Sequence, residues 1–245
     1  MTMYELTSRL SQHPVLCLSP HTDDLAYSMG GLIAAMHAKT SLSSVNVFCT
    51  SIWAPNIEAK GPETISSIRR EEDLIFCGKY RITAAYWETP DSGCRGYDKV
   101  TELSTAPELD PVWPDVAHRI AGLLRTSMYH IIFAPLALGG HVDHQIVRDA
   151  ILRSRLRRQL TVFYEDVPYC SRLNLMQIER IVSTYVPSAI PVRIAIDIDQ
   201  KLEDMRLYFS QTRQEDLDAA CIHAQRRGSP NGFSEQFWIL EDSAA

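Results

Sequence analysis

The chain of 245 residues lacks several features that would assign it to a protein class at once. It contains no apolar run of the ~18–20 residues that a membrane-spanning helix requires. Residues 1–13 are polar and lack the apolar core of a signal peptide. There is no basic tract, and the net charge is −6, from 24 Lys+Arg against 30 Asp+Glu. We therefore expect no nucleic acid and no membrane among its partners.

The cysteines form no CxxC pair, and all six are far apart in the sequence: Cys17, Cys49, Cys77, Cys94, Cys170 and Cys221. This spacing indicates neither a zinc–cysteine site nor a disulfide framework. Several of these cysteines lie in apolar runs, which is typical of buried free thiols. The cytoplasm is the expected location.

The composition is that of an ordinary globular protein, with 45% hydrophobic and 22% charged residues. Nothing resembles an interdomain linker, so we expect one domain over residues 1–245. Short apolar runs alternate with longer segments of helical periodicity. They predict strands at 14–18, 45–50, 82–87, 130–138, 161–165 and 192–197, and helices at 25–38, 63–76, 114–128, 143–158, 173–185, 200–208 and 213–226.

Strands that are apolar along their whole length predict a parallel sheet covered by helices on both faces. The expected fold is α/β, a Rossmann-like three-layer sandwich with a mostly parallel sheet. Gly30 and Gly31 would allow close packing of the first helix, and Gly78 stands where a helix C-cap would. In such folds ligands bind beyond the carboxyl ends of the strands, which directs attention to the residues that follow them.

The first expected strand is followed by Ser19-Pro20-His21-Thr22-Asp23-Asp24. This segment places one imidazole and two carboxylates at a strand end, directly before a helix. The alternative interpretation is that Asp23 or Asp24 caps that helix, which aspartate does well.

The strand at 130–138 is followed by Gly139-Gly140-His141-Val142-Asp143-His144. The two glycines would let the backbone approach a ligand closely. The two histidines flank a carboxylate, although histidines that merely form hydrogen bonds within a loop would give the same pattern.

The two motifs are more specific together than apart, because both follow strands of one parallel sheet. Histidine and aspartate are zinc ligands, and a catalytic zinc site needs three protein ligands and an open position for water. His21, Asp24 and His144 could supply those three ligands. Asp23, His141 and Asp143 would remain for acid–base chemistry.

In these motifs the chain resembles the PIG-L (LmbE-like) N-acetylglucosaminyl deacetylase family, whose signature is [A/S]-H-P-D-D-E followed by H-x-D-H. Weaker similarities run in order over most of residues 14–211: Arg69-x-x-Glu72, Pro90-Asp91-Ser92-Gly93, Tyr164-Glu165-Asp166-Val167-Pro168-Tyr169, Lys201 and Ser210-Gln211.

The resemblance implies that His21, Asp24 and His144 bind Zn²⁺, although such ligands also accept other divalent metals. It implies that Asp23 is the general base. It further implies that His141 stabilises the oxyanion or donates a proton, and that Asp143 orients His141 and raises its pKa. The expected reaction is hydrolysis of an N-acylated amine, most simply an N-acetylated amino-sugar metabolite, by a metal-bound water.

Two further residues are candidates for substrate binding. Arg69 would reach hydroxyl or phosphate groups of the substrate, unless residues 69–72 are only a solvated helix face. Asp91 lies in a polar segment over residues 88–109, which is long enough to indicate a functional loop. A turn would explain Asp91 equally well.

The chain departs from the family signature in ways that keep other functions open. Leu25 replaces the signature glutamate, Thr22 replaces the proline, and no tyrosine stands next to His141 in the sequence. One alternative is a different zinc-dependent amide hydrolysis or acyl transfer in natural-product biosynthesis. Another is an inactive ligand-binding protein on the same fold. The family also often forms homo-oligomers.

Overall fold

The structure is a computed structural model that describes residues 1–229 and 232–240. Within these residues seven strands form one sheet, in the order β3-β2-β1-β4-β5-β7-β6. Their bounds are β1 Val15–Ser19, β2 Leu42–Asn46, β3 Thr83–Tyr86, β4 Ile131–Pro135, β5 Leu160–Tyr164, β6 Ile190–Ala195 and β7 Ser234–Leu240. Strands β1 to β5 pair in parallel, whereas β7 pairs antiparallel to both β5 and β6. The expected mostly parallel sheet is confirmed.

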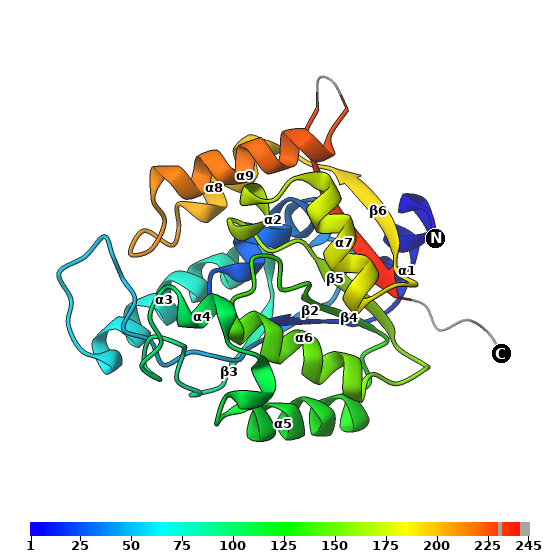
Figure 1. Ribbon diagram of the computed structural model, residues 1–245. Helices are drawn as coiled ribbons and strands as arrows, with labels where there is room; N and C mark the ends of the chain where they lie inside the picture. Colours follow the sequence, from blue (N-terminus) through cyan, green and yellow to red (C-terminus); the bar gives the residue numbers. More distant parts are fainter. Residues whose placement is uncertain (230–231, 241–245) are drawn as a thin grey trace.

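Helices cover the sheet (Figure 1). Their bounds are α1 Met3–Gln12, α2 Asp24–Met36, α3 Pro62–Tyr80, α4 Thr101–Ser104, α5 Trp113–Thr126, α6 Val142–Ser154, α7 Leu175–Tyr185, α8 Ile198–Met205 and α9 Gln214–Arg227, with short 3₁₀ helices η1 Pro107–Leu109 and η2 Tyr169–Arg172. Right-handed crossovers put α2 and α3 on one face and α5 and α6 on the other, because the chain reverses its direction across the sheet between β3 and β4. Helix α2 packs mainly against α8, and α5 packs against α6.

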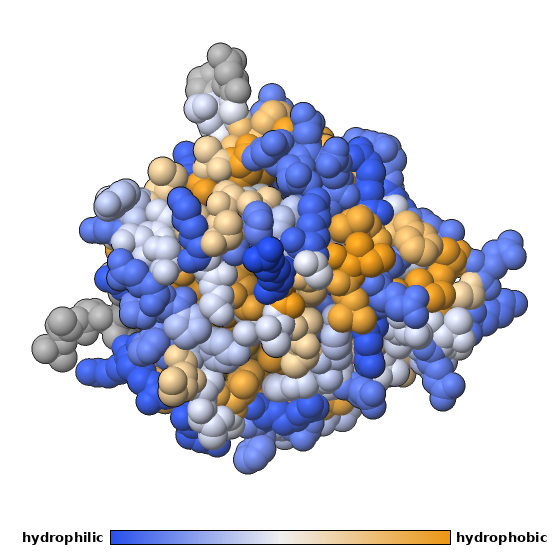
Figure 2. Space-filling view, turned by 180° about the vertical axis from the view of Figure 1, so that it is seen from behind, coloured by the Kyte–Doolittle hydropathy of each residue, from blue (hydrophilic) through white to orange (hydrophobic). Residues whose placement is uncertain are grey.

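The core is the apolar interior that the strand pattern predicts. Every residue of β1, β4, β5 and β7 is buried. The edge strand β3 alternates between exposed and half-buried positions, and β6 buries only Val192 and Ile194. Seen from behind, hydrophobic residues on the surface lie in separate patches among hydrophilic ones (Figure 2). None of the described helices combines the length and apolar character needed to cross a membrane.

Several predicted boundaries are wrong. Helix α3 does not stop before Gly78 but continues to Tyr80, and Arg81 ends it in the left-handed conformation with φ 56°. Strand β2 begins at Leu42, and the end of the predicted 45–50 strand makes only isolated bridges. Helix α6 ends at Ser154, so the basic residues at 155–158 follow the helix. The polar segment from 88 onward contains α4 and η1.

Gly31 is required by the packing of α2. A Cβ added at Gly31 would lie 2.5 Å from Ile196 Cγ2 and 2.6 Å from its Cβ, whereas one at Gly30 would meet only Lys201 Cγ at 3.8 Å. We expect Gly31→Ala to lower the free energy of unfolding by ~1–3 kcal/mol through overpacking. The matched Gly30→Ala variant is expected to change it by less than ~1 kcal/mol. Urea denaturation of both variants tests this, and equal effects would contradict the packing argument.

Candidate active site

The two sequence motifs meet where the strand order reverses. Strands β1 and β4 are neighbours in the sheet, and the chain leaves them in opposite directions across it. The segment after β1 leads into α2, and the segment after β4 leads into α6. In open α/β sheets this reversal opens a crevice beyond the strands, where ligands bind. The sequence therefore folds with both His/Asp motifs at the usual ligand position.

His21, Asp24 and His144 come together as predicted. His21 Nδ1 lies 3.5 Å from Asp24 Oδ2, and His144 Nε2 lies 3.4 Å from Asp24 Oδ1. One donor atom from each of the three lies within 4.8 Å of the others. All three side chains are buried, so the surrounding packing holds them in place.

Each of the two histidines also forms a hydrogen bond with a second carboxylate, through one of its ring nitrogens. His21 Nε2 hydrogen-bonds Asp143 Oδ2 at 2.9 Å, and His144 Nδ1 hydrogen-bonds Asp166 Oδ1 at 2.7 Å. A carboxylate on one ring nitrogen fixes the ring and leaves the other nitrogen for a metal. In agreement, His144 Nε2 is buried and has no hydrogen-bond partner among the described residues.

The donor set fits Zn²⁺. Two imidazole nitrogens and one carboxylate oxygen converge, which is a known ligand combination for catalytic zinc. In a second group, His21, His141 and Asp143, one donor atom from each residue also lies within 4.8 Å of the others. It would use the His21 nitrogen that already bonds Asp143, whereas the first group uses the nitrogen that faces Asp24. The first group is therefore the better zinc site.

The electrostatics around His21, Asp24 and His144 favour a positive charge between these side chains. Burial by itself lowers the pKa of His21, but hydrogen bonds to Asp143 and Asp24 outweigh it and raise this pKa to about 10. Burial raises the pKa of Asp24, yet His144 and His21 bring it down to about 2. The two carboxylates thus stabilise a cation between the histidines.

The side chain of Asp23 does not cap α2, although the sequence allowed that interpretation. It occupies the N-cap position of α2, but its side chain makes no capping hydrogen bond. Asp24 does not cap the helix either, since its Oδ2 accepts the backbone N–H of His21 at 2.7 Å. Asp23 Oδ1 lies 3.4 Å from Arg69, and burial raises the pKa of this carboxyl despite that arginine. A raised pKa suits a group that must accept a proton.

The geometry around His141 differs from the expected one. The carboxylate of Asp143 does not hydrogen-bond the His141 ring; instead, the backbone N–H of Asp143 donates to His141 Nδ1 at 3.2 Å. Oδ2 of Asp143 bonds His21 and also accepts the N–H of Ser92, and Oδ1 accepts from Arg95 at 2.6 Å. Burial lowers the pKa of His141 to about 3, so the expected increase does not occur. Desolvation outweighs the nearby carboxylate here.

Arg69 lies next to Asp23 on one side of the site, and Asp91 lies next to Arg69. Arg69 is 5% exposed, so a solvated helix face does not describe it. Its guanidinium donates to Ser51 Oγ at 2.6 Å and lies 4.0 Å from Asp91 Oδ2. Asp91 also closes a turn, because its Oδ1 accepts the N–H of Cys94 at 2.9 Å. The turn interpretation of Asp91 is thus correct, and it holds the carboxylate beside Arg69.

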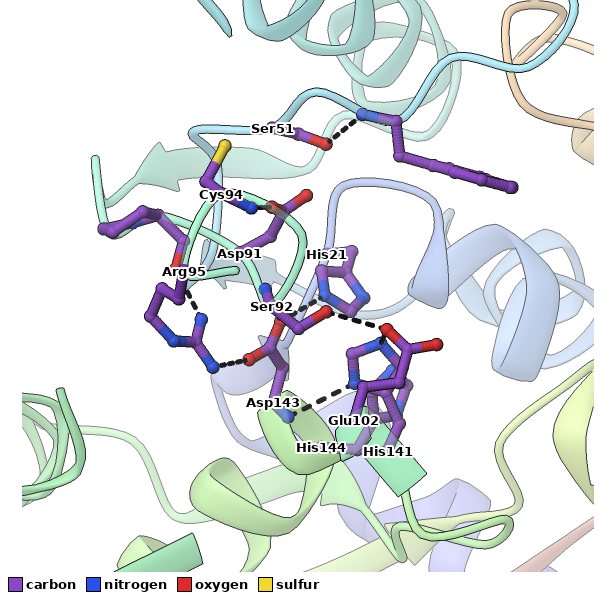
Figure 3. A network of polar contacts seen from close by, with 12 residues as sticks. His21, Ser51, Asp91, Ser92, Cys94, Arg95, Glu102, His141, Asp143 and His144 are labelled. Carbon is purple, nitrogen blue, oxygen red and sulfur yellow. Dashed lines mark hydrogen bonds and ion pairs between the residues drawn. The ribbon is translucent and has the colours of Figure 1, made fainter. Parts of the chain in front are cut away.

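Several residues at the site were not among the sequence candidates. Figure 3 shows Ser92, Arg95 and Glu102 around Asp143 and the histidines. They come from the polar segment after β3; Ser92 had a weak signal in Pro90-Asp91-Ser92-Gly93, whereas for Arg95 and Glu102 the length of the segment was the only signal. Tyr169 packs its ring against those of His141 and His144, at 5.7 and 5.4 Å between centroids, although 25 or more residues separate them in sequence. Asp166 had a weak signal, as part of the motif after β5.

Asp166 offers a test of the histidine–carboxylate pairs. We expect Asp166→Asn to weaken zinc binding by ~10–100-fold, because the amide cannot support the His144 ring as the carboxylate does. Competition with a chromophoric chelator measures this affinity. Asp115→Asn, at an exposed position on α5, is the matched control and is expected to bind zinc as the parent does. Unchanged affinity in the Asp166 variant would contradict the role of this pair.

Comparisons with known proteins find a family, a relative and solved structures to which this chain is similar. The PIG-L model, described as GlcNAc-PI de-N-acetylase, matches residues 16–154. A 2'-N-acetylparomamine deacetylase of Streptomyces fradiae is 38% identical over 238 residues, which cover 94% of this chain and 84% of that protein. A deacetylase of the teicoplanin biosynthesis pathway shares the fold, with a TM-score of 0.73 and 19% identity over 95% of this chain and 100% of that one. A zinc-inhibited form of teicoplanin deacetylase gives a TM-score of 0.71, with 19% identity and the same coverage.

Proposed function

The chain belongs to the PIG-L family of de-N-acetylases, and from that premise we propose that it removes the acetyl group from an N-acetylated amino sugar in natural-product biosynthesis. The enzyme is an N-deacetylase, and Zn²⁺ is its cofactor. One observation carries the assignment of the site: His21, Asp24 and His144 converge at the reversal of the sheet, and the buried His144 Nε2 has no hydrogen-bond partner in residues 1–229 and 232–240.

In this proposal His21, Asp24 and His144 hold the zinc ion. Bound zinc polarises a carbonyl group and lowers the pKa of water towards ~7. Asp143 and Asp166 keep the two imidazole rings in the orientation that the ion requires. Arg95 neutralises Asp143 from the side away from His21, because it bonds the other carboxylate oxygen.

Asp23 and His141 move the protons. Arg69 lies 3.4 Å from Asp23 Oδ1, which leaves Oδ2 as the oxygen that would accept the proton of the attacking water. His141 Nδ1 accepts the backbone N–H of Asp143. The other nitrogen, Nε2, therefore carries the hydrogen that stabilises negative charge on the amide oxygen or passes to the leaving amine.

Arg69 and Asp91 are the proposed contacts to the sugar. Arg69 lies beside Asp23, with Asp91 next to it, where the part of the substrate next to the amide would be placed. The free state of all six cysteines supports the cytoplasm as the proposed location. The amino-sugar substrate is supported by the activity of the Streptomyces fradiae relative.

The direct test incubates the zinc-loaded enzyme with 2'-N-acetylparomamine, N,N'-diacetylchitobiose or N-acetylglucosamine. Both the released acetate and the newly formed free amine are measured. We expect stoichiometric acetate and amine from at least one of them. N-formyl and simple peptide amides serve as comparison substrates. Hydrolysis of these amides alone, with none of the acetylated sugars cleaved, would overturn the proposal.

A further inference from the structure

Glu102 is a carboxylate beside the active site that the reaction described above does not use. It lies on the short helix α4, and its side chain is 24% exposed. Its Oε2 accepts the hydroxyl hydrogen of Ser92 at 3.0 Å and lies 3.7 Å from His141 Nε2. Figure 3 shows the other oxygen with no contact to the residues drawn. Glu102 therefore presents one carboxylate oxygen to the space next to the reacting groups.

The local structure holds Glu102 in this position. Asp98 Oδ1 accepts the backbone N–H groups of Val100 and Thr101 at the start of α4. On the other side α4 rests directly on the loop before α6, since a Cβ at Gly140 would lie 2.9 Å from the carbonyl oxygen of Leu103. With its bond to Ser92, Glu102 is fixed by contacts on both sides.

Glu102 has no lysine or arginine partner within the part of the chain that the structure describes. Arg69 donates a hydrogen bond to Ser51 and forms an ion pair with Asp23. Arg95 forms ion pairs with Asp110 and Asp143 instead of Glu102. Among the described residues the only ion-pair contact of Glu102 is His141, at a distance longer than a hydrogen bond.

The site as a whole also has an excess of negative charge. Its connected contacts contain two guanidinium groups, Arg69 and Arg95, and seven carboxylates: Asp23, Asp24, Asp91, Glu102, Asp110, Asp143 and Asp166. With His21 and His144 neutral as its ligands, a Zn²⁺ ion does not balance this difference. A cleft with uncompensated carboxylates attracts cationic ligands and binds them more tightly than neutral ones.

We propose that Glu102 binds an ammonium group of the substrate, so that the enzyme selects N-acetylated amino sugars that carry a second, free amine near the acetylated one. This rests on the proposed deacetylase function and narrows its substrate class. The ammonium group pairs with the free oxygen of Glu102, while the acetamido group reaches the zinc ligands. No covalent step involves Glu102.

The experiment compares Glu102→Gln with the parent enzyme, both zinc-loaded, on 2'-N-acetylparomamine and on neutral N,N'-diacetylchitobiose. 2'-N-Acetylparomamine keeps free amines besides the acetylated one, whereas N,N'-diacetylchitobiose has no free amine. A charge-assisted hydrogen bond is lost in the variant, so KM for acetylparomamine is expected to rise ~10–100-fold with kcat nearly unchanged. KM for diacetylchitobiose is expected to stay the same. Glu108→Gln, in the same segment but paired with Arg153 on the surface, is the matched control.

Calorimetric binding of paromamine to the zinc-loaded proteins provides a second readout that needs no turnover. We expect it to weaken by the same factor in Glu102→Gln and to remain unchanged in Glu108→Gln. Equal losses on both substrates, or a fall in kcat alone, would show that Glu102 acts through His141 and would overturn the proposal. If the parent enzyme cleaves neither sugar, the deacetylase proposal fails, while the calorimetric difference still decides whether Glu102 binds an ammonium group.

Discussion

Asp23→Asn is expected to lower kcat by ~10²–10⁴-fold with little change in KM. The carboxylate stands at the start of α2 without a capping role, and Arg69 engages only one of its oxygens. Asparagine has a similar shape but cannot accept the proton of the attacking water. Steady-state acetate release on the best substrate measures the effect.

Two controls separate this loss from damage to the fold or to the metal site. Zinc content by elemental analysis is expected to equal that of the parent, because Asp23 is not a proposed ligand. The melting temperature is expected to change little, since no helix cap is lost. Activity within a factor of ten of the parent, in a variant with full zinc content, would remove Asp23 from the role of general base.

Removal of the metal is expected to lower activity by at least ~10³-fold, because zinc contributes several kcal/mol of charge stabilisation to such reactions. Dialysis against a chelator, followed by stoichiometric zinc, should remove and then restore acetate release. His144→Ala is expected to lose bound zinc as well as activity, since its buried Nε2 has no hydrogen-bond partner among the described residues and faces Asp24. Full activity after exhaustive chelation would contradict the metal assignment.

Thermal unfolding distinguishes lost metal from lost folding. A ligand that binds only the native state raises the melting temperature as its concentration increases. Zinc is expected to raise the melting temperature of the metal-free parent and to leave that of His144→Ala unchanged. His118→Ala, at an exposed position on α5, is the control and is expected to keep both zinc and activity.

The fold could be predicted from the sequence where local pattern and tertiary environment agree. Strands β1 and β4 are apolar runs that are buried on both faces, so their pattern alone identifies them. The end of α3 could not be predicted, because Gly78 looks like a helix stop and yet Arg81 adopts the left-handed conformation. Helix α1 also went unpredicted: its polar sequence buries only Leu6 and Leu10.

The partners of the site residues were beyond prediction for a different reason. His21 bonds Asp143 across 122 residues, and His144 bonds Asp166 across 22. Nothing in either local segment specifies these pairs. The sequence suggested instead that Asp143 supports its neighbour His141, and the folded backbone turns that carboxylate towards His21.

The sequence by itself determined the chemistry available to this protein: two His/Asp segments, each following an apolar strand, in a chain with an excess of acidic residues. Strand order and crossover geometry then brought these segments together. Only the tertiary structure decided which carboxylate supports which imidazole, how far burial shifts the pKa of His141, and that Glu102 lies beside the reacting groups. Hydrogen bonding and desolvation depend on atoms that are near in space, and residues distant in the chain supply most of those atoms.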